Sequence, residues 1–290
     1  MNIKCRCCNN KSLKEIGPLP EGVSFAGVSL NPPMSGGMLM HCDQCSMALR
    51  HPILEKNEYN SLYFKAPSSI WSSRKREYLK LLRPDQKIIN KYLINKFAKN
   101  KSSTSILDIG CYTGSFLLSL PEYFSKFGIE ASAEARKLAG SKNITIVGND
   151  LYSINTALKF DVIVLMDVIE HIDNPGAYIN QIKKLLNENG EIIVTTGNYD
   201  SATFKFYKNT FWYAKYLEHI SFIGESWLNK FAMHNGYEIL IFKEFRNFEL
   251  FRVKIFAKRF INYFLMKFNV SIPSMSGSSI DHFMFSIKLK

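Results

Sequence analysis

A short apolar segment that runs into a glycine-containing turn is the feature that most limits the fold of this chain. Residues 106–114 read Ile-Leu-Asp-Ile-Gly-Cys-Tyr-Thr-Gly. An apolar run with these borders suits a buried parallel strand. Glycine at the turn lets a ligand lie against bare backbone, and the helix that follows offers N–H groups. The spacing differs from the Gly-x-Gly-x-x-Gly of dinucleotide enzymes and contains no phosphate-binding Gly-Lys-Ser/Thr. The turn therefore predicts a nucleotide site at the carboxyl end of a strand in an open α/β sheet.

Strand and helix patterns alternate along the rest of the chain. Helices are predicted over Gly114–Phe124, over Ala133–Ala139 after the N-cap Ser132, from the N-cap Asn174 towards Gly190, and over Trp227–Asn235. The predicted strands are Ile106–Ile109, Phe127–Glu130, Ile144–Val147, Phe160–Met166, Glu191–Thr195, Tyr237–Phe242 and His282–Lys288. Such alternation predicts a parallel sheet with helices on both faces.

Charge and composition narrow the class of protein. Lys and Arg number 37 against 25 Asp and Glu, a net charge of +12, which favours anionic partners without choosing among them. No signal-peptide pattern and no run of roughly 18 apolar residues is present. We therefore expect a cytoplasmic, reducing environment, in which the six cysteines need a reason other than disulfides.

Four of the cysteines have the spacing of metal ligands. Cys5-x-x-Cys8 and Cys42-x-x-Cys45 are pairs of the kind that close on one tetrahedral zinc ion. The segment between the pairs is rich in Gly and Pro and is predicted to form turns and short strands. Four thiolates leave no open position, so the predicted zinc is structural. A set of free thiols is the alternative, and His41 is a further candidate ligand.

Two acids follow the next strands of the predicted sheet. Glu130 comes twenty residues after Gly110, where folds of this kind hold a ribose by its two hydroxyls. Asp150 ends the third strand, where an acid can accept from an adenine amino group. A solvated loop glutamate and an ordinary turn pair are the alternatives for these two positions.

The chain resembles the class I S-adenosylmethionine-dependent methyltransferases. The resemblance spans roughly residues 104–245 and rests on 107–114, Gly128-Ile129-Glu130, the segment 160–175 ending Ile-Glu-His-Ile-Asp-Asn-Pro, and 190–194. It implies a Rossmann-like α/β fold with a seven-stranded, mostly parallel sheet whose last strand is antiparallel. It also implies S-adenosylmethionine as cofactor. The implied cofactor contacts are Asp108, Gly110, Cys111 and Gly114 for the methionine part, Glu130 for the ribose, Asp150 for the adenine and Asp167 near the sulfonium.

The N-terminal part is similar to the zinc-binding domain that precedes the methyltransferase domain in sugar-modifying enzymes. The best studied of these are C-methyltransferases of deoxysugar nucleotides, and their Tyr-x-Glu-His motif is matched by Tyr216-Leu217-Glu218-His219. Those enzymes have a further large C-terminal domain, whereas only about 40 residues follow residue 249 here. We therefore expect methyl transfer to oxygen rather than carbon.

The resemblance suggests which side chains act on the acceptor. A hydroxyl needs a base as the methyl group arrives, and histidine is suited to this near neutral pH. His219 is the predicted base, with Glu218 orienting it and Tyr216 as a hydrogen-bonding partner. Docking of the 218–222 loop over the sheet is the alternative. His171 follows the fourth strand and is a second candidate for a catalytic role.

The segment 250–280 combines basic and aromatic residues and contains no acid. One interpretation is an amphipathic helix inserted before the last strand with its aromatic stripe in the core. Residues 250–268 could instead contact an anionic membrane surface or a substrate phosphate.

The sequence thus predicts three parts: a zinc-binding module over 1–55, a helical cap over 56–103, and a methyltransferase domain over 104–290. The predicted substrate is a sugar, sugar nucleotide or glycan precursor. A non-sugar metabolite such as a quinone, and a nucleic acid, are the alternatives, and the front module is too weakly basic to favour nucleic acid.

Overall fold

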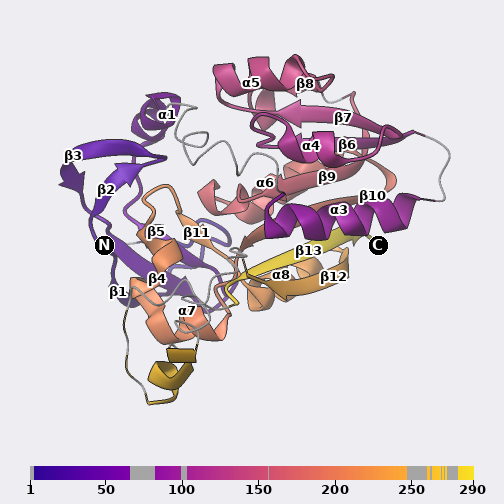
Figure 1. Cartoon of the computed structure of the whole chain (residues 1–290). Helices are drawn as coiled ribbons and strands as arrows, with labels where there is room; N and C mark the ends of the chain where they lie inside the picture. Colours follow the sequence, from indigo (N-terminus) through magenta and orange to yellow (C-terminus); the bar gives the residue numbers. More distant parts are fainter. Residues whose placement is uncertain are drawn as a thin grey trace.

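The computed structural model describes residues 3–65, 82–98, 103–155, 157–246, 260–261, 263–268, 270, 272 and 280–290 (Figure 1). Part of the predicted helical cap over 56–103 (66–81 and 99–102) and most of the basic segment 250–268 lie outside the described residues. In the described part of the chain no helix has the length and apolar character needed to cross a membrane.

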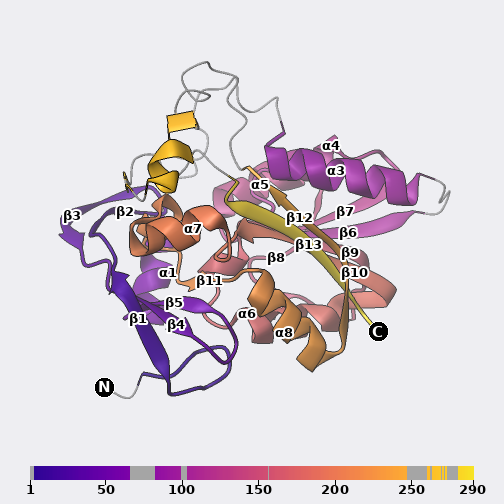
Figure 2. The same ribbon diagram turned by 90° about the horizontal axis from the view of Figure 1, so that it is seen from below.

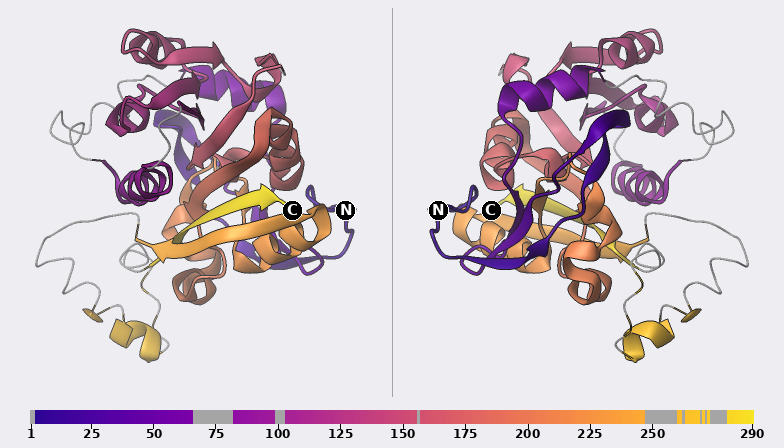
Figure 3. Two further views of the ribbon diagram at one scale, coloured as in Figure 1. Left: turned by 90° about the vertical axis from the view of Figure 1, so that its right-hand side faces the viewer. Right: turned by 90° about the vertical axis from the view of Figure 1, so that its left-hand side faces the viewer.

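A seven-stranded sheet forms the centre of the molecule, in the order β12-β13-β10-β9-β6-β7-β8. Its strands, in chain order, are β6 (Thr104–Ile109), β7 (Phe124–Ile129), β8 (Thr145–Gly148), β9 (Phe160–Met166), β10 (Leu186–Gly197), β12 (Tyr237–Phe245) and β13 (His282–Leu289). Neighbours from β10 to β8 are parallel, and the last strand, β13, runs antiparallel to both β10 and β12 (Figure 3). The predicted fold class is confirmed.

Helices cover both faces of this sheet (Figure 2). The α-helices are α1 (Lys56–Lys65), α3 (Pro84–Phe97), α4 (Ser115–Ser119), α5 (Ala133–Gly140), α6 (Pro175–Ile182), α7 (Ala202–Tyr207) and α8 (Glu225–Asn235). Short 3₁₀ turns are η2 (Leu151–Ser153), η3 (Ile169–His171), η4 (Lys183–Leu185), η5 (Lys208–Thr210) and η6 (Trp212–Lys215). Ser132 and Asn174 cap α5 and α6 through their side chains, and Gly236 ends α8 at φ 70°, as predicted.

Alternation along the central strands explains the two layers of helices. In β9, Val162 and Val164 pack with α3 and α4, whereas Ile163 and Leu165 pack with α6 and α8. Successive side chains of a strand point to opposite faces, so an almost wholly apolar strand must be covered on both sides. Each buried aliphatic side chain contributes about 1.5–3 kcal/mol, which makes this double cover the main stabilising element.

Two predicted helix boundaries are wrong. The helix predicted over Gly114–Phe124 ends at Ser119, because Pro121 disfavours the helical conformation at Leu120, and β7 already begins at Phe124. The helix that begins at Pro175 ends at Ile182 and not near Gly190. Gly190 instead lies in β10, at an irregularity in its pairing with β9.

The N-terminal residues form a separate small sheet beside the central one. Its order is β1 (Leu13–Pro18), β4 (Met38–Cys42), β5 (Ala48–His51) and β11 (Ser221–Phe222), and β2 (Gly22–Phe25) pairs with β3 (Val28–Met34). The strand β11 follows the Tyr-x-Glu-His segment and pairs with β5. The N-terminal strands therefore hold the part of the chain that carries the predicted base (Figure 3).

Candidate active site

The turn after β6 brings the backbone of two glycines to the carboxyl edge of the sheet. Gly110 and Gly114 have φ values of 80° and 76°, which favour glycine. A Cβ at Gly110 would lie 2.8 Å from Cγ2 of Val168, and one at Gly114 would overlap Cδ1 of Ile144. The turn therefore tolerates no side chain at either position.

Asp108, near the end of β6, is buried, and no described residue donates a hydrogen bond to it. Its side chain is 1% exposed, and neither carboxylate oxygen has a partner among the described residues. Burial raises the pKa of Asp108 well above its usual value, and Arg83 is the nearby cation that opposes this. An orphaned buried carboxylate costs free energy unless a ligand brings donors to it. The residue thus fits a ligand that carries N–H groups or positive charge.

Glu130 follows β7 and is tied to the same turn. Its carboxylate accepts from the backbone N–H groups of Tyr112 at 2.9 Å and Ser132 at 2.8 Å, and burial raises its pKa. The buried Cys111 lies between these strands, and its Sγ fills the space beside Gly128. These contacts fix the position of the glutamate relative to the glycine turn.

The remaining predicted cofactor residues end the neighbouring strands. Asp150 is exposed after β8 and caps η2 by accepting from the N–H groups of Tyr152 and Ser153. Asp167 follows β9 with φ 55° and accepts from Nη1 of Arg83 at 3.0 Å. Because β6, β7, β8 and β9 are parallel neighbours, all seven predicted cofactor residues lie along one edge of the sheet.

The residues predicted to act on the acceptor also come together. His219 is 8% exposed, and its Nδ1 lies 2.8 Å from the carbonyl oxygen of Tyr213. Burial, and then the neighbouring His171, lower the pKa of His219 well below its usual value. The His171 ring is 5.0 Å from the His219 ring, and its Nδ1 contacts the carbonyl oxygen of Glu218 at 2.9 Å. The Tyr216 ring lies 5.1 Å from the His219 ring.

A buried acid that was not among the predicted site residues completes this group. Glu170 is 1% exposed and accepts from the Tyr213 hydroxyl at 2.6 Å and from the Thr196 hydroxyl at 2.9 Å. Its Oε1 lies 3.9 Å from Nε2 of His171. Tyr213 and Thr196 lie on η6 and β10, and no sequence spacing connects them to Glu170. Only the tertiary structure identifies them.

Arg50 is a second residue that sequence reasoning missed. It lies on β5, is 2% exposed, and donates from Nε to the carbonyl oxygen of His219 at 3.1 Å. Its Nη2 donates to the carbonyl oxygens of Ala214 at 2.7 Å and Tyr216 at 3.0 Å, and its Nη1 donates to that of Gly36. Burial lowers its pKa to about 10. One guanidinium of the N-terminal sheet thus binds three carbonyls of the segment that carries His219.

The four cysteines predicted to bind zinc are brought together by the N-terminal strands. The Sγ atoms of Cys5, Cys8, Cys42 and Cys45 all lie within 4.8 Å of one another, and two of the separations are 3.6 Å. Thiolates that share one zinc ion lie roughly 3.8 Å apart, given zinc–sulfur bonds of about 2.3 Å. Cys7 is outside this group and accepts from Nε1 of Trp227 at 3.4 Å. The ring of His41 stacks on Tyr199 and is not part of the group.

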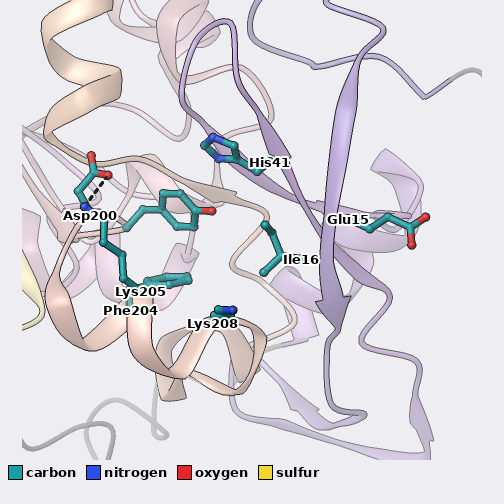
Figure 4. A pocket seen from close by; sticks show the side chains of 8 residues that line it. Glu15, Ile16, His41, Asp200, Phe204, Lys205 and Lys208 are labelled. Carbon is teal, nitrogen blue, oxygen red and sulfur yellow. Dashed lines mark ion pairs between the residues drawn. The ribbon is translucent and has the colours of Figure 1, made fainter. Parts of the chain in front are cut away.

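A hollow of about 400 Å³ lies between the N-terminal sheet and α7 (Figure 4). It is lined by Glu15, Ile16, His41, Tyr199, Asp200, Phe204, Lys205 and Lys208. Lys205 and Asp200 form an ion pair of 3.6 Å on one wall. None of the predicted catalytic or cofactor residues lines this hollow.

Comparisons with known proteins show the family and the fold of this chain. A family model described as a methyltransferase domain matches residues 77–240, more than half of the chain. This chain belongs to the methyltransferase domain family. Its central sheet is similar to that of the magnesium protoporphyrin IX methyltransferase of Synechocystis PCC 6803, which was solved with bound S-adenosylhomocysteine. The TM-score is 0.54 at 13% identity over 81% of this chain and 100% of the other, which establishes a class I methyltransferase fold.

Curated relatives match part of the chain as well. A ubiquinone biosynthesis O-methyltransferase of Pelagibacter ubique is 33% identical over 39% of this chain and 50% of its own length. An uncharacterised protein of Methanocaldococcus jannaschii is 25% identical over 59% of this chain and 84% of its own length. The chain spans about half the length of the first of these relatives.

Proposed function

We propose that this methyltransferase-family protein transfers the methyl group of S-adenosylmethionine to a hydroxyl of a small acceptor. The observation that carries the proposal is the buried carboxylate of Asp108, which receives no hydrogen bond from the described residues and lies beside the turn between Gly110 and Gly114. The methionine part of the cofactor brings an ammonium group that meets this need. When bound, the cofactor supplies an electrophilic methyl group on a sulfonium.

The other predicted cofactor residues have matching chemistry. The Glu130 carboxylate is oriented by two backbone N–H groups and retains lone pairs for the two ribose hydroxyls. Asp150 would accept from the adenine amino group at the rim, and Cys111 packs beside Gly128. Asp167 is held beside Arg83 at the end of β9, where the reacting end of the cofactor would lie.

The acceptor binds next to the histidines. The carbonyl oxygen of Tyr213 receives the Nδ1 proton of His219, which leaves the lone pair of the neutral imidazole on Nε2. Among the chain's own side chains, Nε2 of His219 is therefore the candidate base for the hydroxyl proton. Glu218 positions His171 through its carbonyl oxygen, and Tyr216 borders the same space. The buried Tyr213 ring lies 4.1 Å from the His219 ring and shields that side of the imidazole from water.

The proposed acceptor is a sugar, sugar nucleotide or glycan precursor, methylated on oxygen. The four-cysteine module and the Tyr-x-Glu-His segment support the sugar class, and the module would hold one structural zinc ion. Oxygen is supported by the O-methyltransferase of P. ubique among the relatives. That same relative favours a second candidate, a phenolic metabolite of the quinone type.

Calorimetry with S-adenosylhomocysteine tests the cofactor assignment. Glu130→Ala is expected to weaken binding by roughly 10- to 100-fold, because two charge-assisted hydrogen bonds to the ribose are lost. Glu188→Ala is the matched control, since this glutamate is exposed and far along the chain from the turn. An affinity unchanged by Glu130→Ala, or no binding by the wild-type protein, would overturn the proposal. Incubation with methyl-labelled cofactor and either sugar nucleotides or catechols then separates the two acceptor classes.

A further inference from the structure

We infer that Glu170, His171 and His219 bind one divalent transition-metal ion, and that the acceptor hydroxyl takes the open position on it. One carboxylate oxygen and one ring nitrogen from each histidine lie within 4.8 Å of one another. Donor atoms that share a tetrahedral zinc ion lie roughly 3.3 Å apart. Small side-chain rotations would shorten the distance of 3.9 Å between Oε1 of Glu170 and Nε2 of His171 to this value.

Both imidazoles are oriented as metal ligands are. Nδ1 of His171 faces the carbonyl oxygen of Glu218, and Nδ1 of His219 faces that of Tyr213. A carbonyl oxygen only accepts, so each Nδ1 carries a proton, and in the neutral ring the lone pair is on Nε2. Metal-binding histidines commonly donate their other N–H to a backbone carbonyl in this way, which fixes both the tautomer and the ring.

A cation would also stabilise the buried negative charge of Glu170. The carboxylate is almost completely buried, and the donors to it are the neutral hydroxyls of Tyr213 and Thr196. The buried guanidinium of Arg50, which contacts the same segment as His219, is directed at backbone carbonyls. A buried carboxylate is stable when it is paired or coordinates a metal. A carboxylate has about four acceptor sites, so two hydroxyl donors leave lone pairs of Glu170 for such an ion.

Two imidazoles and one carboxylate are the donor set of many catalytic zinc sites and of non-haem iron sites, which keep positions open for substrate. The set differs from the four thiolates of the N-terminal module, which favour zinc and leave no position open. His171 is partly exposed, so the ion and the acceptor reach the cluster from its side. Glu170 and His171 come three and four residues after Asp167, at the edge proposed for the sulfonium.

This inference rests on the proposed function and changes one step of it. With an ion on Nε2 of His219, the hydroxyl proton passes to solvent water rather than to the imidazole, because a bound cation lowers the pKa of the hydroxyl. The acceptor oxygen then forms a bond to the methyl carbon. The bond between carbon and sulfur breaks, and its electron pair stays on the sulfur. The proton balance and the products are unchanged.

Manganese binding tests the inference without interference from the thiolates. Mn²⁺ prefers carboxylate and imidazole donors to thiolates, so electron paramagnetic resonance of free Mn²⁺ reports on this cluster. The full-length protein is dialysed against metal-free buffer, its zinc content is checked so that the four-thiolate ion is retained, and it is titrated with MnCl₂; one Mn²⁺ per chain is expected. Glu170→Gln and His171→Ala are expected to weaken binding by more than roughly 100-fold. His234→Ala is the matched control, since His234 is an exposed histidine outside the cluster.

Binding of S-adenosylhomocysteine by the same samples separates the two proposals and reports whether each variant is folded. Wild-type protein that binds the cofactor product but no Mn²⁺ overturns the metal site and leaves His219 as the base. Mn²⁺ affinity that is equal in the wild type and in folded Glu170→Gln also overturns it. Protein that binds Mn²⁺ but not S-adenosylhomocysteine overturns the proposed function and leaves the metal site standing.

Discussion

The residues proposed for the cofactor and those proposed for the acceptor lie at the same edge of the sheet but differ in what holds them there. Asp108 lies near the end of β6, and Glu130 and Asp167 directly follow β7 and β9, so the hydrogen-bonded ladder positions all three. His219 lies in an irregular segment that is held by Arg50 and β5 of the N-terminal sheet. The cofactor side is therefore built from one domain's own topology, whereas the acceptor side depends on a second sheet.

The largest expected effect on the acceptor side comes from the loss of one cysteine ligand. Cys42→Ser removes a thiolate from the proposed zinc site, and a structural zinc contributes much of the folding free energy of a small module. We expect loss of about one zinc per chain and loss of methyl transfer, because β4 and β5 then no longer hold the segment around His219. Metal analysis and S-adenosylhomocysteine calorimetry measure the two sides separately. Cys7→Ser is the control and should keep its zinc; a full zinc content in Cys42→Ser would contradict the site.

A conservative change at Arg50 sharpens the comparison. Arg50→Lys keeps the positive charge but cannot bind several carbonyls at once. We expect turnover to fall by roughly 100-fold, the effect of misplacing a reacting group by about 1 Å. Affinity for S-adenosylhomocysteine should change less than about twofold, because the cofactor residues do not contact Arg50. Equal losses of affinity and turnover would show that the two sides are not held independently. Lys14→Arg, at an exposed site of the same sheet, is the matched control.

The smallest expected effect concerns stability at the cofactor side. Burial raises the pKa of Asp108, so the unfolded chain gives up this proton near pH 4 while the folded chain retains it to higher pH. The free energy of unfolding of the wild type therefore falls as pH rises from about 4 to the folded pKa, and is level above it. Asp108→Asn removes this loss. The variant should be more stable than the wild type by about 1–3 kcal/mol at high pH, with no difference below pH 4.

Urea unfolding at several pH values measures this difference. Asp161→Asn provides the comparison: burial opposes ionisation of Asp161, but hydrogen bonds from Ser105 and Asn187 outweigh it and lower the pKa, so this variant should lose stability at high pH. A lower stability of Asp108→Asn at every pH would show that the carboxylate is not strained in the folded state.

The cofactor side was accessible to sequence reasoning because its signals are local. Strand, acid and glycine turn are contiguous, and the parallel order of β6, β7 and β9 then brings their ends together. The spacing of the cysteine pairs similarly predicted their grouping. The end of α4 was misjudged although Pro121 is also a local signal, and the length of β10 was missed because Gly190 resembled a helix stop.

The sequence by itself determined the fold class, the line of acids along one sheet edge and the convergence of four cysteines. Each of these follows from local patterns of strands, turns and cysteine pairs. Only the tertiary structure decided that Glu170 and His171 meet His219, and that Arg50 holds the segment between them and the N-terminal sheet. The contacts of His219 with His171 and Arg50 join residues 48 and 169 positions apart along the chain. The contact of its Nδ1 with the Tyr213 carbonyl oxygen sets the direction of the ring. Packing and hydrogen bonding in three dimensions fix such contacts, and no periodicity of the chain encodes them.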